Sequence, residues 1–237
     1  MSHPFMRKFE EHPLGVAFED SNVTAFFGDR RSTPDALSLA FPDFTFIGLK
    51  QTHSDIVIAS PYEGAQPEGD AHFTKAHRVA LTIRTADCVP VLIHDPDSGF
   101  IAAIHAGWRG VENEIVRKTG ARLQENGTDL KRARAWIGPH IGLESFEVGD
   151  DVASKLEARL DAVRGHSDVA TAIHPHDASG KKKVDLLSIV RAQLRSIGIE
   201  SERTTEHAID TFTSPHHESF RRDRERATRQ ISFIAFK

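Results

Sequence analysis

Short apolar runs rich in β-branched residues dominate the middle of the chain and limit it to a fold built around a sheet. The runs are FTFIGLK, DIVIAS, RVALTIRT and PVLIHD, at residues 44–50, 55–60, 78–85 and 90–95. Each has the length and composition of a buried strand. The segment DPDSG, residues 95–99, is typical of a turn, so residues 91–94 and 100–104 are predicted to form a hairpin.

Helices are predicted before and after these strands. The first is predicted from a helix start, with Ser32 or Thr33 as cap and Pro34 in the first turn, and the last two from apolar residues at helical spacing. The segments are residues 32–41, 111–125, 150–163 and 184–199. The third segment carries Val152, Leu156, Leu160 and Val163 on one face. An Asn-Gly pair ends the second segment, and Asp185 is placed to cap the last. Further strands are predicted at residues 23–27, 133–138 and 230–236.

The order of these elements indicates an α+β fold. Neighbouring strands follow one another in hairpins, whereas a doubly wound parallel sheet alternates strictly between strand and helix. Neither an internal repeat nor a low-complexity linker divides the sequence. We therefore predict a single compact domain over residues 1–237, with a mixed β-sheet and packed helices.

Composition narrows the class of protein. Hydrophobic residues make up 39% and charged residues 27% of the sequence, as in globular domains. The net charge of −4 argues against a nucleic-acid partner, and the basic run at residues 221–229 also holds two acids. Cys88 is the single cysteine, which excludes an intramolecular disulfide and fits a reducing compartment. No signal peptide or membrane span is evident, so we expect a cytoplasmic protein without a membrane partner.

Three potential metal ligands follow strand-like runs. His53 lies between two of them, Cys88 between two more, and His105 ends the run IAAIH. A thiolate with two imidazoles suits zinc or copper, and three protein ligands leave one coordination position open, as in catalytic zinc sites. The spacing lacks a recognised metal motif, so a hydrogen-bonded histidine and a buried cysteine are the alternative interpretation.

The segment HAGWRG indicates a second kind of site. Its glycines permit a sharp turn from strand to helix, where backbone N–H groups can face an anion such as phosphate. Arg109 could add a two-pronged contact, and Trp108 could stack on a base or pack under the loop. The alternative is a plain turn with a surface arginine. Arg222 is a second candidate for binding phosphate.

Six motifs together resemble one family. They are KQTHSDIV, GDAHFT, RTADCVPVLIHD, AAIHAGWRG, WIGPHIGLESFEVGDDV and ESFRRD, in order from Lys50 towards the C-terminus. The sequence is thereby similar to the YfiH-like family, also called the multicopper polyphenol oxidase or laccase-domain family. The resemblance implies the compact mixed α/β laccase-domain fold. It also implies a zinc ion held by His53, Cys88 and His105, which are the expected catalytic residues.

The resemblance also implies activities and substrates. The family's activities are phosphorolysis of adenosine, inosine and methylthioadenosine, and deamination of adenosine. The expected partners are therefore a purine nucleoside and phosphate. This sequence has His140 where many relatives have a cysteine, and it lacks their N-terminal Arg-Gly-Gly segment. We therefore expect a zinc-dependent purine nucleoside phosphorylase, with copper as the alternative metal.

Three other functions compete with this expectation. A copper-dependent polyphenol oxidase would need several copper sites, and one cysteine and two methionines are too few ligands for them. A hydrolase with a peptidoglycan-editing role could use Cys88 as nucleophile and His105 as base. A non-catalytic zinc-binding module would need a fourth ligand, for which His72 and His140 are available.

Overall fold

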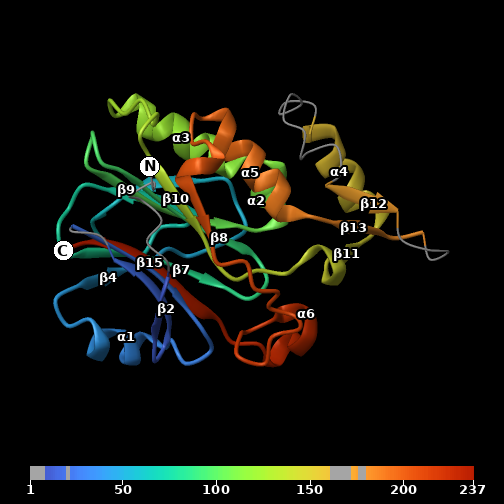
Figure 1. The fold of residues 1–237 in the computed structure, drawn as a ribbon, viewed down its shortest axis with the longest axis horizontal. Helices are drawn as coiled ribbons and strands as arrows, with labels where there is room; N and C mark the ends of the chain where they lie inside the picture. The colour runs from blue at the N-terminus through green and yellow to red at the C-terminus, as the bar shows by residue number, and fades with distance from the viewer. Residues whose placement is uncertain (1–8, 20–21, 161–171, 176–179) are drawn as a thin grey trace, which may run out of the picture.

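Two six-stranded mixed sheets pack face to face at the centre of the molecule (Figure 1). The computed structural model describes residues 9–19, 22–160, 172–175 and 180–237. The first sheet has the order β1 (Glu10–His12), β2 (Gly15–Glu19), β3 (Val23–Gly28), β15 (Gln230–Phe236), β7 (Val79–Thr85), β4 (Thr45–Ile47). The second has the order β14 (Thr204–Glu206), β10 (Arg134–Ile137), β8 (Val89–Asp95), β9 (Phe100–Ala106), β6 (Ala71–Thr74), β5 (Val57–Ala59).

Strands β8 and β9 form the predicted hairpin, and both faces of it are buried. Val91 and Ile104 point towards the helices, whereas Leu92 and Ala103 point towards the first sheet. Because successive side chains of a strand alternate between its faces, a strand covered on both sides is apolar throughout. This burial explains why the middle of the sequence shows continuous apolar runs.

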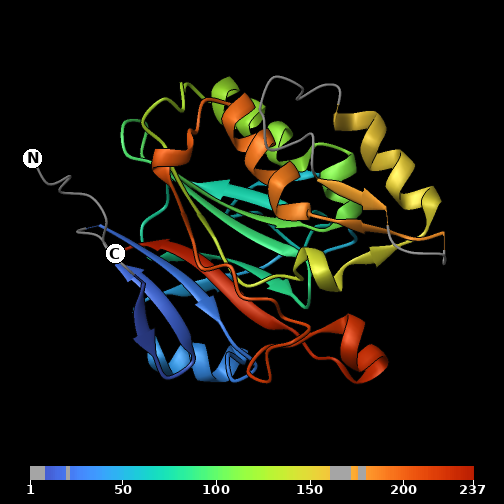
Figure 2. The same ribbon diagram turned by 45° about the vertical axis from the view of Figure 1, so that its right-hand side comes forward.

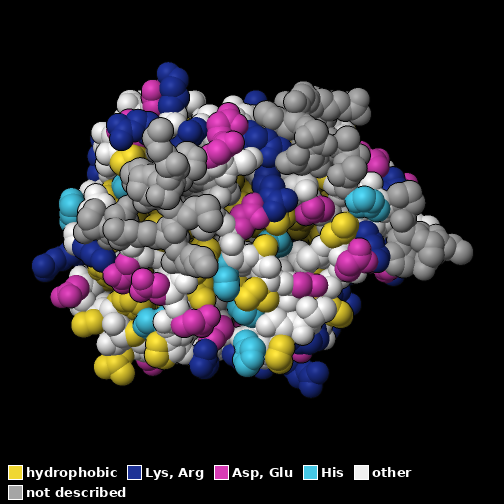
Figure 3. All heavy atoms as spheres, viewed as in Figure 1, with side chains coloured by type: hydrophobic (Ala, Val, Ile, Leu, Met, Phe, Trp, Pro, Cys, Tyr) yellow, Lys and Arg dark blue, Asp and Glu magenta, His cyan; other side chains and the backbone are white. Residues whose placement is uncertain are grey.

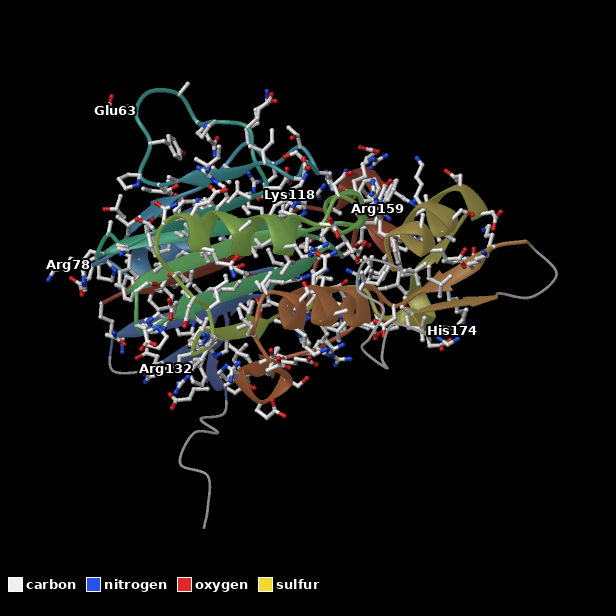
Figure 4. The ribbon with its side chains drawn as sticks, turned by 90° about the horizontal axis from the view of Figure 1, so that it is seen from above. Glu63, Arg78, Lys118, Arg132, Arg159 and His174 are labelled. Atoms are coloured by element: carbon white, nitrogen blue, oxygen red, sulfur yellow. The ribbon has the colours of Figure 1, made fainter. Side chains whose placement is uncertain are left out.

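Helices cover the outer faces of both sheets (Figure 2). Those of the second sheet are α2 (Trp108–Glu112), α3 (Ile115–Glu125) and α5 (Leu186–Ser196). Helix α1 (Pro34–Ala40) covers the first sheet. Seen from above, α3 with Lys118 and α5 lie side by side, and His174 lies near α4 (Figure 4). The predicted α+β class is confirmed, because mixed sheets and packed helices share one compact unit.

The remaining elements lie to one side of the sheets. Helix α4 (Asp150–Leu160) packs on a small antiparallel sheet of β11 (Glu147–Val148), β13 (Lys182–Val184) and β12 (Ile173–Pro175). Helix α6 (Phe220–Asp223) lies at the same end of the two large sheets as β11 (Figures 1 and 2). Short 3-10 turns occur at Leu143–Ser145, Ser201–Arg203 and Arg224–Arg226.

One predicted helix is wrong in part. Residues 111–125 belong to two helices, because Glu114 adopts a left-handed backbone with φ of 62° and separates α2 from α3. The cap of α5 is confirmed, since the Asp185 side chain accepts a hydrogen bond from the backbone N–H of Ser188. Val163, assigned to the third predicted helix, lies outside the described residues.

The surface agrees with the modest net charge. On the face shown in Figure 3, basic and acidic side chains are interspersed and do not separate into patches. In the part of the chain that the structure describes, no helix is long and apolar enough to cross a membrane.

Phe233 is the centre of the aromatic cluster under α1, and its truncation tests the fold. Its ring is fully buried and lies 5.0 Å from the ring of Phe41 and 5.1 Å from that of Phe26, between centroids. Phe233→Ala should lower the free energy of unfolding by about 3–5 kcal/mol, because it leaves a cavity. Leu39→Ala, at a side chain that is 84% exposed, should change it by less than about 0.5 kcal/mol. Urea denaturation of both variants checks this, and equal losses would contradict it.

Candidate metal centre and its cavity

The structure brings His53, Cys88 and His105 together. His53 comes from the loop between β4 and β5, Cys88 immediately precedes β8, and His105 lies near the end of β9. One potential ligand atom from each lies within 4.8 Å of those of the other two. The Cys88 Sγ is 3.8 Å from the His53 Nε2. Among the described residues, this is the group of three that could hold a metal ion.

The β8–β9 pairing explains how Cys88 meets His105. Val89 pairs with Ala106 and Pro90 pairs with His105, so the hairpin places the thiol beside the imidazole. His53 has a left-handed backbone with φ of 60°. Because this loop is not part of the β8–β9 hairpin, a separate anchor must hold the His53 ring beside Cys88 and His105.

Asp70 supplies that anchor. The residue is fully buried just before β6, and its carboxylate accepts hydrogen bonds from the backbone N–H groups of Thr52, His53 and Ser54 at 3.2, 3.0 and 2.6 Å. The same carboxylate accepts the Ser54 hydroxyl at 2.6 Å and meets the His105 Nδ1 at 2.7 Å. One buried charge thus fixes both the loop that carries His53 and the ring of His105.

This geometry leaves the Nε2 atom of His105 as its ligand atom. A carboxylate on the other ring nitrogen of a metal-binding histidine fixes the tautomer and the ring orientation. Asp70 has this relation to His105. Asp70 was not among the site residues predicted from the sequence, although GDAHFT has an acid directly before an apolar strand.

The charges in this cluster shift one another's pKa values. Burial would raise the pKa of Asp70, but hydrogen bonds from His105 and Ser54 outweigh it and lower the value to about 2. Burial also opposes the thiolate, yet the neighbouring His105 and His53 lower the pKa of Cys88 to about 6. In return, Cys88 and Asp70 raise the pKa of His105 to about 9 against the effect of burial. The cluster therefore favours a thiolate, the form that binds metal.

Gly107 leaves the space that an ion at this site requires. A Cβ atom at residue 107 would lie 2.9 Å from the His53 Cδ2 and 3.0 Å from the Cys88 Sγ. Any side chain there would push the ligands apart. The soft donor set, the anchored ring and this gap together fit zinc or copper.

Neither His72 nor His140 belongs to the cluster. His72 is fully buried and uses both ring nitrogens, at 3.3 Å from the Ser60 hydroxyl and 3.1 Å from the Thr82 carbonyl oxygen. His140 places its Nδ1 2.8 Å from the carbonyl oxygen of Gly138. Among the described residues, the cluster therefore has three protein ligands, which is the pattern of catalytic zinc sites.

A cavity of about 960 Å³ opens beside the cluster, which forms part of its wall. Three aromatic residues line the cavity: Trp108, Phe146 and Phe220. Six cationic residues line it as well: Lys50, Arg84, Arg109, Arg221, Arg224 and Arg229. Asp87 is the one acid among its lining residues, so the cavity is strongly basic although the whole chain is acidic.

Asp87 connects the metal cluster to the basic wall. Its carboxylate accepts the backbone N–H of Arg221 at 2.6 Å and the hydroxyl of Thr211 at 2.7 Å. Its own carbonyl oxygen accepts the N–H of Ile141 at 2.9 Å. Because Cys88 is the next residue, these bonds hold three segments, two of which line the cavity, beside a candidate metal ligand.

The two arginines named from the sequence differ in their surroundings. Arg109 lines the cavity, and its guanidinium lies 4.3 Å from the ring centroid of Trp108. Arg222 does not line it. Its guanidinium donates to the carbonyl oxygens of Thr211, Phe212, Ser214 and His217 and to the carboxylate of Asp223. Arg222 thus holds the chain near α6, and its neighbours Arg221 and Arg224 are the residues that reach the cavity.

A His-Cys-His cluster beside a basic cavity defines a candidate metalloenzyme, and its fold recurs among solved structures. The hypothetical protein YfiH of Bacillus licheniformis superimposes with a TM-score of 0.84 at 24% identity, over 97% of this chain and 99% of that one. YlmD of Geobacillus stearothermophilus gives 0.81 at 20% identity, over 97% and 98%. At these identities the likeness shows the fold.

The chain belongs to the multi-copper polyphenol oxidoreductase laccase family, whose sequence model matches residues 8–237. This confirms the resemblance seen in the motifs. A protein of Haemophilus influenzae named purine nucleoside phosphorylase is 35% identical over 196 residues, which are 81% of this chain and 75% of that protein.

Two other relatives align over about half of their own length. A protein of Bacteroides thetaiotaomicron, also named purine nucleoside phosphorylase, is 39% identical over 152 residues, which are 64% of this chain and 53% of that protein. A protein named adenosine deaminase RL5, from an unknown prokaryotic organism, is 31% identical over 144 residues, 61% of this chain and 53% of that one.

Removing the charge of Asp70 should weaken metal binding without emptying the site. Asp70→Asn keeps the size of the side chain but loses the charge that fixes His105, and outer partners of this kind are worth about 10–100-fold in metal affinity. Asp55→Asn, in the same loop but paired with Lys118, should change it by less than about twofold. Competition of each variant with a zinc chelator of known affinity measures this. Equal affinity in Asp70→Asn and the parent protein would contradict it.

Proposed function

We propose that this protein is a zinc-dependent purine nucleoside phosphorylase that acts on adenosine, inosine and methylthioadenosine, with adenosine deamination as a further activity. The observation that carries the proposal is the joining of a His-Cys-His cluster to a basic, aromatic-lined cavity. The names of the relatives supply the purine nucleoside, and the cavity offers groups suited to each part of it.

In this proposal His53, Cys88 and His105 hold the metal, with copper as the alternative ion. Bound there, zinc would supply Lewis-acid chemistry next to the cavity. Asp70 keeps the ligands in place and balances part of their charge. His53 and Cys88 also line the cavity, so a substrate could approach the metal directly.

Arg109 is proposed to hold the attacking phosphate. Its guanidinium lies in the cavity next to the cluster and forms no ion pair with any described residue. Guanidinium groups bind phosphate through two parallel hydrogen bonds. Helix α2 has only five residues, so its dipole adds little, and the side chain carries this role.

The reaction can be written in terms of these groups. A phosphate oxygen forms a bond to C1′ of the ribose while the bond from C1′ to the purine nitrogen breaks. The purine leaves with that electron pair and takes a proton, and ribose 1-phosphate remains. Positive charge develops on the sugar in the transition state. The phosphate that Arg109 holds beside the sugar stabilises this charge as it attacks C1′.

The aromatic side chains are proposed to hold the base. Trp108 lies beside Arg109, and Phe146 lies 5.5 Å from the guanidinium carbon of Arg221, measured at its ring centroid. A purine could stack on such a face, and the arginines would bind the anionic partner. A nucleoside and a phosphate would then fill different parts of the cavity.

One observation favours a second candidate, a cysteine hydrolase. Asp70, His105 and Cys88 are arranged as an orienting carboxylate, a base and a nucleophile would be. The lowered pKa of Cys88 would also activate a nucleophile. The two candidates differ towards iodoacetamide, because a thiolate bound to zinc would be protected and a free one would react rapidly.

The chemistry predicts that turnover of inosine depends on phosphate and on Arg109. The parent protein should yield ribose 1-phosphate only when phosphate is present. Arg109→Ala should raise the KM for phosphate at least about tenfold while the zinc content stays the same, because a charged contact is lost. Arg122→Ala, on the exposed surface of α3, should leave both values unchanged.

Product analysis by chromatography checks this prediction. Release of hypoxanthine at the same rate without phosphate would indicate a hydrolase. An unchanged phosphate KM in Arg109→Ala would remove this residue from the phosphate site.

A further inference from the structure

A second, smaller cavity adjoins the larger one and shares part of its wall. The smaller cavity has a volume of about 210 Å³ and lies against α1 and the first sheet. Both cavities share four lining residues: Leu49, Gln51, Gln66 and Arg84. Arg109 and the three candidate metal ligands line the larger cavity but not the smaller one. Arg84 therefore lies where the two cavities adjoin, whereas Arg109 borders the larger cavity only.

Arg84 has a fixed backbone and a cationic head without an acidic partner. The Gln51 side chain donates to the Arg84 carbonyl oxygen and accepts from the Arg84 N–H, both at 2.8 Å. The amide of Gln51 thus replaces the strand partner that β4 no longer provides beyond Ile47. No described residue forms an ion pair with the guanidinium, although it lines both cavities.

The charge of the cavity exceeds what one phosphate needs. Lys50 is paired with Glu68, and Arg221 donates to the carbonyl oxygen of Glu147. Arg229 likewise donates to the carbonyl oxygens of Ala227 and Thr228. The side chains of the other three cavity-lining arginines form neither an ion pair nor a hydrogen bond with a described residue: Arg84, Arg109 and Arg224. Like charges gathered around one space repel each other, and bound anions relieve that repulsion. If Arg109 holds the attacking phosphate, Arg84, on the part of the wall shared with the smaller cavity, is available to a second anion.

We propose that Arg84 forms a second anion subsite, which binds the phosphate of a purine nucleoside that is phosphorylated on its ribose. The inference rests on the proposed function, which places the nucleoside in the larger cavity. A cavity of about 960 Å³ lies near the upper end of the range for small-molecule sites, so it has room for this additional group. Arginine suits a phosphate monoester because its planar fork matches two oxygens at once. The substrate class then includes nucleoside monophosphates beside free nucleosides.

The experiment compares ligands that differ only in the ribose phosphate. Inosine, inosine 5′-monophosphate and inosine 3′-monophosphate are titrated calorimetrically into the zinc-loaded protein, without inorganic phosphate, so that neither phosphorolysis nor deamination consumes the ligand. The parent protein should bind at least one monophosphate about tenfold or more tightly than inosine, because a charged contact is gained. In Arg84→Ala this preference should disappear, and Arg84→Lys should restore part of it.

Arg132→Ala is the matched control, because Arg132 is exposed, pairs with Asp97 and lies outside both cavities. It removes the same charge and should keep the full preference for the monophosphate. Equal affinity for inosine and both monophosphates in the parent protein would overturn the proposal. The same holds if Arg84→Ala loses affinity for all three ligands by one common factor.

Inosine phosphorolysis, assayed on the same preparations, separates the two proposals. If turnover is absent while the preference for a monophosphate depends on Arg84, the anion subsite stands and the proposed function falls. If turnover is normal and Arg84→Ala instead raises the KM for phosphate, Arg84 is the clamp for the attacking phosphate, and the second subsite is overturned.

Discussion

The site depends on one buried carboxylate. Asp70 has no exposed surface, and a charge in that environment is costly unless hydrogen bonds surround it. Three backbone N–H groups, one hydroxyl and one imidazole meet this need. The same bonds close the loop that carries His53 and orient the ring of His105. Stabilising the charge and assembling the ligands are therefore one structural event, and the side chain of Asp70 need not contact the metal.

Two residues near this cluster, Gly107 and Asp87, shape the cavity beside it. Gly107 leaves the ligands room at the start of α2, where any side chain would meet the His53 ring and the Cys88 sulfur. Asp87, the residue before Cys88, holds the segments around Ile141, Thr211 and Arg221 through its hydrogen bonds. Movement of the basic wall would thus strain a metal ligand. The structure offers a rigid arrangement in which an ion, a purine face and anion-binding arginines can act together.

The sequence predicted most of the fold, because strands buried on both faces and amphipathic helices leave patterns of local period. It failed at Glu114, where a left-handed residue divides an otherwise regular helical pattern. The metal ligands were named from their chemistry and from the family motifs. Asp70 was missed, because its partners lie 16 to 35 residues away and leave no period. Arg222 was preferred to Arg221 and Arg224, although only a fold can show which of them faces the cavity.

The central claim is that His53, Cys88 and His105 hold one zinc ion. Its most direct test is the metal content of protein purified without added metal, measured by inductively coupled plasma mass spectrometry for the parent protein and Cys88→Ser. The account predicts close to one zinc per chain in the parent protein. It predicts a marked loss in the variant, because the soft ligand is gone. A parent protein with neither zinc nor copper, whose Cys88 reacts rapidly with iodoacetamide, would contradict the account and favour the cysteine hydrolase.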